Sequence, residues 1–285
     1  MDEEPRRYRN VMLPLDGSPT SESAVPLAAT IAQRAEATLH VVRVTGPSER
    51  SVGSEEYLTQ VVARIEAEYG SRAVATAREG KVVDSLVDEA ARCDADVTVM
   101  ATHGRSGLSR LWLGSVATGV LSATDRPLML FRPDGGAATG AAPQRFTKIL
   151  MPLDGSAPSE ECLPHAVALG ELFDATYHLT RVVRVPDEVP TAYFDEERAS
   201  ALDYLEDHAE RMRAEQRTVS TSVRLEQQPA RGILAVCATE DCDAIVMATR
   251  GREGLGRVLL GSTADKVLRG AEVPMLLFGP RTIKS

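Results

Sequence analysis

Two sixteen-residue segments of this chain carry glycines, arginines and a closing Gly-Ser pair in the same order. Residues 100–115 read MATHGRSGLSRLWLGS and residues 247–262 read MATRGREGLGRVLLGS, with eleven of sixteen positions identical. Glycine lets a backbone approach a ligand closely, arginine supplies positive charge, and the free N–H groups at the start of a helix favour an anion. This combination predicts a phosphate-binding loop, present twice.

Individual residues of the two loops have separate expected roles. We expect Gly104 and Gly114 to allow close approach and positive φ angles, and Ser115 and Ser262 to act as helix N-caps. The charge comes from Arg105 and Arg110 in the first loop and from Arg250, Arg252 and Arg257 in the second. The counterpart of His103 in the second loop is Arg250, which argues against a role of the histidine in acid–base catalysis. The counterpart of Trp112 is Leu259, which favours a packing role for the tryptophan over stacking on a base.

A second repeated motif ends in a carboxylate. Residues 10–18 read NVMLPLDGS and residues 148–156 read KILMPLDGS, with five of nine positions identical. Asp16 and Asp154 are therefore candidate ligands, although Asp-Gly-Ser is also a common turn sequence. The offset between copies is 138 residues here and 147 between the loops, so about nine residues were added, and we expect them in Arg184–Ser200.

The spacing of apolar residues alternates between strand and helix patterns, which is typical of βαβ crossovers and a parallel sheet. Each half is predicted to be a doubly wound α/β domain with a five-stranded parallel sheet flanked by helices. The predicted strands are residues 11–15, 38–44, 71–77, 97–101 and 128–131, then 149–153, 177–183, 218–225, 244–248 and 275–278. The predicted first-half helices are residues 24–35, 55–69, 84–92 and 115–124.

The predicted order of elements places the motifs together. Ligands of such sheets bind at the C-terminal ends of the strands, at the switch point. Asp16 and Asp154 follow the first strands, and the glycine loops follow the fourth strands. Neither loop is a P-loop or the G-x-G-x-x-G of a dinucleotide site.

The chain of 285 residues is long enough for two domains. Residues 137–144, within the Gly-, Ala- and Pro-rich segment PDGGAATGAAPQ, have the composition of a linker. We therefore expect domains at residues 1–136 and 145–285.

Composition and charge limit the binding partners and the cellular compartment that we expect for this chain. The net charge of −9 argues against general binding to nucleic acid or to an anionic membrane. The first ten residues lack the apolar stretch of a secretory signal, and no apolar run has the length of a membrane helix. The four cysteines form no C-x-x-C pair, so we expect reduced thiols, no zinc site and a cytoplasmic protein.

The pattern G-x-x-G, nine residues, G-S after the fourth strand, with P-x-D at the end of the first, resembles the universal stress protein family. The resemblance covers nearly the whole chain and implies a tandem member with two such domains. It also implies a Rossmann-like fold of the adenine nucleotide alpha hydrolase-like type. One branch of the family binds ATP or another adenine nucleotide, and the glycine motif marks that branch.

The resemblance also implies site residues. In the first half these are Pro14, Asp16, Val44, Ala101, Gly104, Arg105, Gly114, Ser115 and Val116. In the second half they are Pro152, Asp154, Val182, Ala248, Gly251, Arg252, Gly261, Ser262 and Thr263. Asp16 and Asp154 would also lie where Mg²⁺ could accompany the nucleotide. This chain departs from the family at Ala101 and Ala248, where the motif has its first glycine.

Three functions are therefore compared. The first is an ATP-binding regulatory or sensor protein of the stress response. The second is a nucleotide-dependent enzyme on a related fold, although no nucleophile with a base, no catalytic carboxylate pair and no metal cluster is evident, so at most weak ATP hydrolysis is expected. The third is a structural or interaction protein without ligand. The last strands favour pairing of the two halves as an internal pseudo-dimer, and association of two chains is left open.

Overall fold

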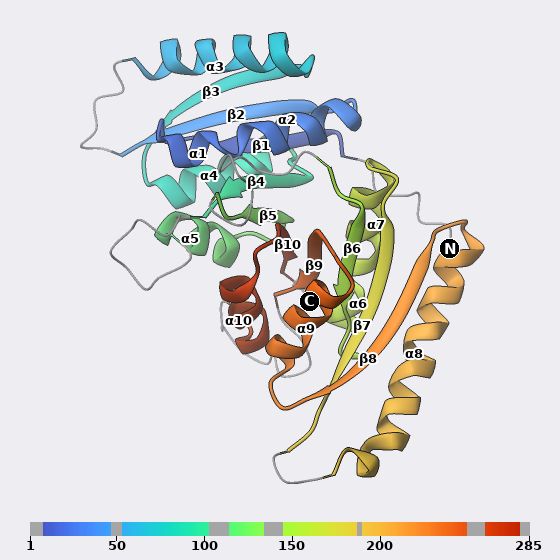
Figure 1. Ribbon diagram of the computed structural model, residues 1–285. Helices are drawn as coiled ribbons and strands as arrows, with labels where there is room; N and C mark the ends of the chain where they lie inside the picture. Colours follow the sequence, from blue (N-terminus) through green and yellow to red (C-terminus); the bar gives the residue numbers. More distant parts are fainter. Residues whose placement is uncertain are drawn as a thin grey trace, which may run out of the picture. The chain divides into compact units, whose positions relative to one another are not determined.

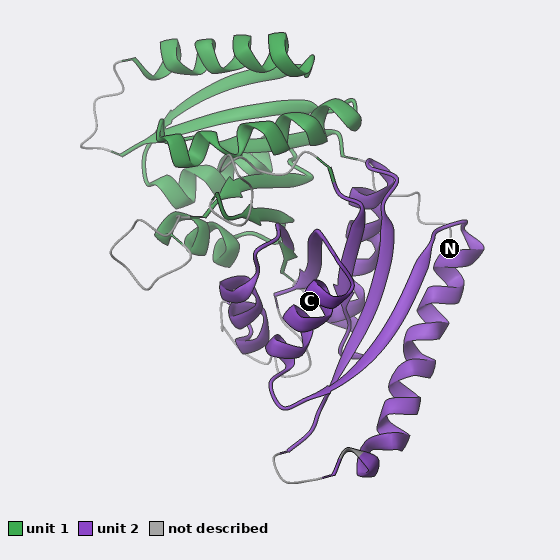
Figure 2. Cartoon of the chain, viewed as in Figure 1, with its two compact units in different colours: residues 1–145, 277–285 green, residues 146–276 purple. Residues whose placement is uncertain are grey.

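The computed structural model describes residues 8–46, 53–102, 114–133, 145–186, 190–249 and 260–279. The chain divides into two compact units, unit 1 with residues 1–145 and 277–285, and unit 2 with residues 146–276 (Figure 2). In each unit the strands carry helices on their faces, as the sequence predicts (Figure 1). The division between the units falls within the last strand, Met275–Phe278. The sequence-based boundaries instead assign this whole strand to the second domain.

The strands of unit 1 form a parallel arrangement with the order β3-β2-β1-β4-β5. They are β1 (Asn10–Pro14), β2 (Thr38–Thr45), β3 (Ala73–Glu79), β4 (Val97–Ala101) and β5 (Leu128–Phe131). The five predicted strands of this half are confirmed, and β3 begins two residues later than expected. Because the chain first builds outward from β1 on one side and then returns to β4 on the other, the switch point lies between β1 and β4.

Helices connect these strands on both faces. They are α1 (Pro19–Glu22), α2 (Val25–Arg34), α3 (Ser54–Tyr69), α4 (Val82–Arg92) and α5 (Ser115–Ala123). Helix α2 packs on α3, and α4 packs on α5. Right-handed crossovers that run in opposite directions from the switch point place these pairs on opposite faces. Two-sided cover explains why Val11, Met12 and Leu13 of β1 are all fully buried.

Unit 2 repeats the arrangement with the strand order β10-β9-β6-β7-β8. Its strands are β6 (Lys148–Pro152), β7 (Thr176–Arg184), β8 (Val219–Glu226), β9 (Ala244–Ala248) and β10 (Met275–Phe278). Its helices are α6 (Ala157–Glu160), α7 (Cys162–Glu171), η1 (Thr191–Phe194, 3₁₀), α8 (Asp195–Ala214), α9 (Pro229–Thr239) and α10 (Ser262–Gly270). The predicted strands of the second half are confirmed.

The added residues of unit 2 lie before the buried part of α8. Leu58 and Ile65 of α3 are buried, and the residues 147 positions later, Leu205 and Met212 of α8, are buried as well. The two helices therefore match from about residue 201 onward, and η1 with the first turns of α8 has no counterpart in α3. This agrees with the place predicted for the insertion. Among the described residues, no helix is both long and apolar enough to cross a lipid bilayer.

Candidate functional site

The candidate site of each unit lies where the first and fourth strands end side by side. Strand β1 pairs with β4, and β6 pairs with β9, in parallel. Asp16 therefore lies at the same edge as Ala101, and Asp154 at the same edge as Ala248, as the sequence predicts. Four predicted site residues lie outside the described residues, as do the loop residues around them: Gly104, Arg105, Gly251 and Arg252, with His103, Arg110, Trp112, Arg250, Arg257 and Leu259.

Asp16 is held in a tight turn at the start of α1. Its Oδ1 accepts the Ser18 N–H at 2.8 Å, and its own N–H donates to Ser21 Oγ at 3.3 Å. Gly17 has φ +86°, a left-handed conformation that glycine adopts without strain. Partial burial raises the pKa of Asp16, but hydrogen bonds from Ser18 and Ser21 outweigh it and lower the pKa overall. The result is an exposed, ionised carboxylate with a fixed orientation.

The second unit repeats this turn. Asp154 Oδ1 accepts the Ser156 N–H at 2.9 Å, and the Asp154 N–H donates to Ser159 Oγ at 3.3 Å. Gly155 has φ +82°. Ser156 is the N-cap of α6, as Ser18 is of α1. Both aspartates therefore form the turn, and each still presents its carboxylate at the strand edge.

The residues that cap the two helices after the loops differ from the prediction. The N-caps are Gly114 and Gly261, with φ −59° and −62°, so Gly114 does not take the positive φ that we expected. Ser115 and Ser262 are the first helical residues instead of the caps, and both are exposed. A glycine N-cap has no side chain to accept from the first N–H groups of the helix.

Ala101 and Ala248, which replace the family's first glycine, are the last residues of β4 and β9. Both lie in extended backbone, and neither is among the described residues with positive φ. Alanine adopts an extended conformation as readily as other L residues. The backbone therefore does not require glycine at either position.

The remaining predicted residues line the same edge with different exposures. Pro14 and Pro152 end β1 and β6 and are buried, and Val44 is 9% exposed. Val182 is half-buried, and its methyl groups lie 2.8 Å from where a Cβ on Gly232 of α9 would stand. The Val182 side chain thus packs against α9. Val116 and Thr263 are half-buried second residues of α5 and α10.

A cluster beside the Asp16 turn was missed by the sequence analysis. The Arg43 guanidinium lies 5.0 Å from the centre of the Tyr57 ring, and Tyr57 Oη donates to Glu22 Oε1 at 2.9 Å. The second oxygen of Glu22 accepts from Arg64 at 2.8 Å. Arg43 also lies 3.5 Å from where a Cβ on Gly17 would stand. The cluster therefore links α3 to the turn that carries Asp16.

Unit 2 contains the same cluster with one exchange. Arg181 lies 5.1 Å from the Tyr204 ring centre, and Tyr204 Oη donates to Glu160 Oε1 at 2.9 Å. His208 takes the place of the second arginine, with its Nε2 3.6 Å from Glu160. The signal was available in the sequence, because the arginine and glutamate recur at the offset of 138 and the tyrosine at 147. We call both copies the Arg–Tyr–Glu cluster.

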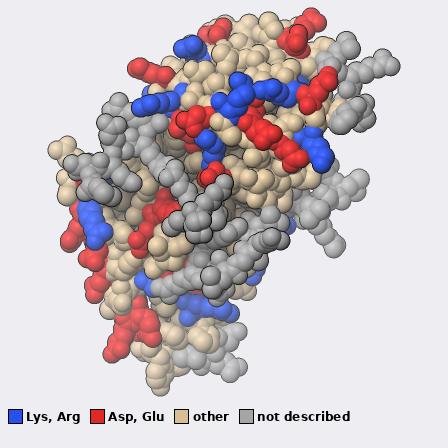
Figure 3. All heavy atoms as spheres, turned by 180° about the vertical axis from the view of Figure 1, so that it is seen from behind, with Lys and Arg blue, Asp and Glu red and all other residues tan. Residues whose placement is uncertain are grey.

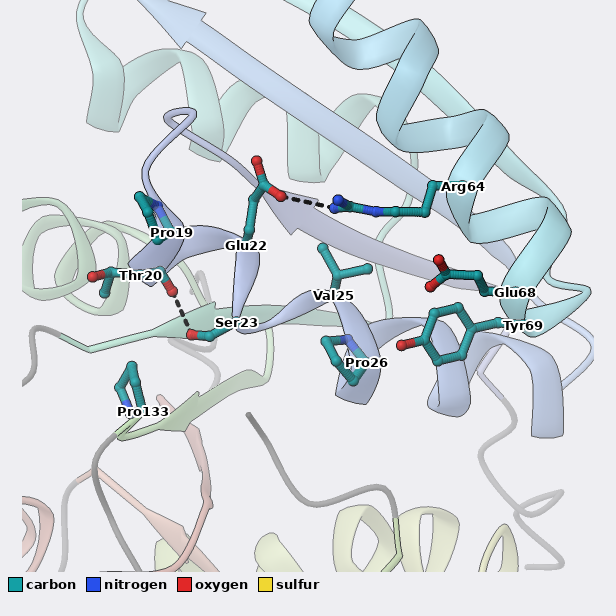
Figure 4. A pocket seen from close by; sticks show the side chains of 10 residues that line it. All are labelled: Pro19, Thr20, Glu22, Ser23, Val25, Pro26, Arg64, Glu68, Tyr69 and Pro133. Atoms are coloured by element: carbon teal, nitrogen blue, oxygen red, sulfur yellow. Dashed lines mark hydrogen bonds and ion pairs between the residues drawn. The ribbon is translucent and has the colours of Figure 1, made fainter. Parts of the chain in front are cut away.

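A groove of about 610 Å³ lies over α1, α2 and α3 of unit 1 (Figure 4). Glu22 and Arg64 pair inside it, and Glu68, Tyr69 and Pro133 complete its wall. The groove is formed by the helix layer, whereas Ala101 and Ser115 lie at the strand ends. It is therefore separate from the candidate site. Within the described part of the chain, no three His, Cys, Asp or Glu residues gather as metal ligands would.

Charge on the described surface is mixed. On the face drawn in Figure 3, acidic and basic side chains alternate over both units instead of forming one broad basic area. The described residues on this face therefore offer no extended basic surface to a polyanion.

Comparisons with known proteins agree on one family. The model described as "Universal stress protein family" matches residues 7–132 and 145–279. A universal stress protein of Mycolicibacterium smegmatis is 27% identical, covering 95% of this chain and 97% of its own length. A crystal structure of a universal stress protein from Archaeoglobus fulgidus covers 95% of this chain and 98% of its own, with 22% identity and a TM-score of 0.76. A solved universal stress protein in complex with cAMP covers 45% of this chain and 98% of its own, at 26% identity and a TM-score of 0.40.

Proposed function

Because the chain belongs to the universal stress protein family, with one family domain in each half, we propose that it is a regulatory protein that binds an adenine nucleotide in each unit. One observation carries the proposal. An aspartate held in a hydrogen-bonded turn and a glycine-capped helix start occur at the same switch point, and both features occur twice.

The geometry supports a division of labour along the strand edge. An ionised carboxylate is acceptor-only, so Asp16 and Asp154 suit the ribose hydroxyl groups. The N–H groups at the starts of α5 and α10, with the Ser115 and Ser262 hydroxyls, suit the phosphates. Val44 and Val182 would border the adenine, and Pro14, Pro152, Ala101 and Ala248 would shape the floor. We extend the phosphate site to Gly104, Arg105, Val116, Gly251, Arg252 and Thr263 by family resemblance.

Any Mg²⁺ would be bound mainly by the nucleotide in this proposal. Magnesium prefers several oxygen ligands and keeps its waters, and it is often held by one or two carboxylates plus substrate phosphates. Asp16 and Asp154 each supply one carboxylate at the edge, with Oδ1 already accepting a backbone N–H. The preferred ligand is therefore ATP with Mg²⁺, and slow hydrolysis is an accompanying activity to be measured.

The test is calorimetric titration of the whole chain with ATP and Mg²⁺, after any co-purified nucleotide has been identified. We expect about two sites per chain, with one lost in Asp16→Ala, one in Asp154→Ala and both in the double variant. Asp203→Ala is the matched control, because Asp203 is exposed on α8, away from the strand edge. AMP and cAMP, added as competitors, show which part of the nucleotide is recognised. Absence of both heat and co-purified nucleotide would exclude the proposal and favour a ligand-free interaction protein.

The domain boundaries and the assembly are further parts of the proposal. We place the domains at residues 1–136 and 145–285, joined by residues 137–144, and propose that the two halves pair as an internal pseudo-dimer. Support comes from the short apolar strands β5 and β10, each at the end of its unit's strand order. Such strands favour pairing. Analytical ultracentrifugation of the 30.7 kDa chain then shows whether two chains also associate, a question that internal pairing leaves open.

A further inference from the structure

Unit 2 carries a buried histidine between two serines, none of which is assigned to the candidate nucleotide site. His178 is the third residue of β7 and lies opposite Ser220 of β8 in the parallel register. Its Nδ1 lies 2.8 Å from Ser220 Oγ, and its Nε2 lies 2.8 Å from Ser222 Oγ. The His178 side chain is 2% exposed, whereas Ser220 is exposed. A buried ring therefore contacts a hydroxyl that solvent can reach.

One arrangement of protons that satisfies every contact leaves Nδ1 of the ring as an acceptor. Each hydroxyl has one proton to donate. In this arrangement Thr180 Oγ1 donates to the Ser222 carbonyl oxygen at 3.1 Å, and Ser222 donates the 3.1 Å contact between the two hydroxyls. Ser222 Oγ accepts from His178 Nε2–H, and Ser220 Oγ–H donates to Nδ1. The reaction proposed for Ser220 uses this tautomer.

The surroundings keep this ring in its basic form. Burial lowers the pKa of His178, the nearby Glu240 carboxylate raises it and Lys148 lowers it, with a net decrease. A neutral imidazole with a free Nδ1 is the form that accepts a proton from a hydroxyl. Glu240 Oε2 lies 3.7 Å from Nδ1, where its charge would stabilise the ring after protonation.

From this geometry we propose that Ser220 is a nucleophile that accepts an acyl group from an activated carboxylic ester, with His178 as the general base. The Ser220 Oγ–carbon bond forms as the bond from the acyl carbon to the leaving oxygen breaks. The Oγ proton moves to His178 Nδ1 and then to the leaving alkoxide or phenolate. The products are acyl-Ser220 and an alcohol, and the arrangement of nucleophile, base and orienting hydroxyl is that of serine nucleophiles in general.

The first unit supplies an internal comparison. His40 is the equivalent of His178 at the offset of 138, but its Nε2 contacts Asn10 Oδ1 at 3.0 Å, and Val74 stands opposite it in the register. Valine has no hydroxyl to activate. The proposed reactivity therefore belongs to unit 2 alone. It does not depend on nucleotide binding, because it uses none of the residues assigned to the nucleotide site.

The experiment uses the full chain with p-nitrophenyl acetate. We expect a burst of p-nitrophenolate that approaches one equivalent and an acetyl group that peptide mass spectrometry places on Ser220. Ser220→Ala should abolish the burst, and His178→Asn should slow it on the order of 100-fold, the usual contribution of a general base. A fluorophosphonate probe should label the same residue.

Ser222 is a positioning residue in this scheme, because it acts through the ring. Ser222→Ala should reduce the burst rate and Ser222→Thr should restore it. Circular dichroism checks that each variant folds, and Ser220→Ala removes one hydrogen bond of the ring while Ser222 Oγ still contacts Nε2. Acetylation confined to lysines and the N-terminus, or a burst unchanged in Ser220→Ala, would overturn the proposal.

Discussion

The two units are alike at the edge of the sheet and different on one face. At the edge, both keep the hydrogen-bonded aspartate turn, the glycine-capped helix and the Arg–Tyr–Glu cluster. On the face beneath α4, unit 1 buries Glu89, which accepts from Arg78 and Arg92. At the equivalent position beneath α9, unit 2 has the buried Val236.

The exchange of Glu89 for valine has a visible consequence. Arg224 of β8 lies opposite Val182 in the register, as Arg78 of β3 lies opposite Val44. Among the described residues, the buried Nε of Arg224 has no hydrogen-bond partner, whereas Arg78 Nε donates to Glu89 at 3.0 Å. A buried polar group can thus lose its partner on the face, while both edges keep the hydrogen bonds that the aspartate makes with the two serines of the turn. The edge is therefore the more tightly specified part of this fold.

Replacing the carboxylate of Glu89 should give the largest change in stability. Glu89→Gln keeps the size of the side chain but removes the charge that holds two arginines, and hydrogen bonds to charged groups contribute about 2 kcal/mol. We expect a loss of that order in unit 1 only. Hydrogen exchange followed by mass spectrometry assigns the loss to a unit, and equal loss in both units would contradict the distinction.

The stability lost in Glu89→Gln should depend on pH. Hydrogen bonding from Arg92 lowers the pKa of Glu89, burial opposes this, and Arg78 lowers the pKa further. Because the pKa of Glu89 is lower in the folded state, its carboxylate stabilises the protein fully at pH values above the ordinary carboxyl pKa of 4.5. This stability is lost as the pH falls through the pKa that Glu89 has in the folded state. The difference between wild type and Glu89→Gln should therefore be full at neutral pH and shrink below about 4.5.

Changing the turn glycines tests the likeness of the edges. Gly17→Ala and Gly155→Ala each force an L residue into positive φ, which costs about 1–2 kcal/mol. We expect equal destabilisation of the two units and weaker ATP binding in each, measured by hydrogen exchange and calorimetry. Gly46→Ala is the control, since its φ lies outside the positive range and a Cβ there meets nothing within 4 Å.

The Arg–Tyr–Glu clusters should respond unequally to loss of the phenol. Tyr57→Phe and Tyr204→Phe each remove one hydrogen bond, a loss of about 1 kcal/mol. In unit 1, Glu22 keeps its 2.8 Å contact with Arg64, whereas Glu160 keeps only His208 at 3.6 Å. We therefore expect the larger increase in exchange of the α8 amides. A larger increase in hydrogen exchange for the α3 amides would show that Arg64 does not hold Glu22 in place.

Restoring the family's first glycine should have the smallest effect. Ala101→Gly and Ala248→Gly replace residues that are already extended, so ATP affinity should stay within about twofold of wild type. The added flexibility should cost about 0.5 kcal/mol of stability. A large gain in affinity, measured by the same titration, would show that the alanine methyl obstructs the ligand.

The repeats and the periodicity of apolar residues were enough to predict the duplication, the strands, the parallel sheets and the edge that carries Asp16 and Asp154. They succeed because two-sided burial imposes continuous apolar strands, and because parallel strands bring their C-terminal ends together. The turn was also predictable, because Asp-Gly-Ser has strong local preferences.

Other features depended on contacts between distant segments. The glycine N-caps, the contact of Arg43 with Tyr57 and the hydrogen bond of Arg78 with Glu89 follow from the path of the chain in space, which sequence spacing does not give. The predicted N-cap Ser115 and the observed N-cap Gly114 differ by one position. The path of the loop in space sets a helix boundary to within one residue. Sequence determined which residues are repeated; only the tertiary structure decided which of them touch, because hydrogen bonds form between neighbours in space.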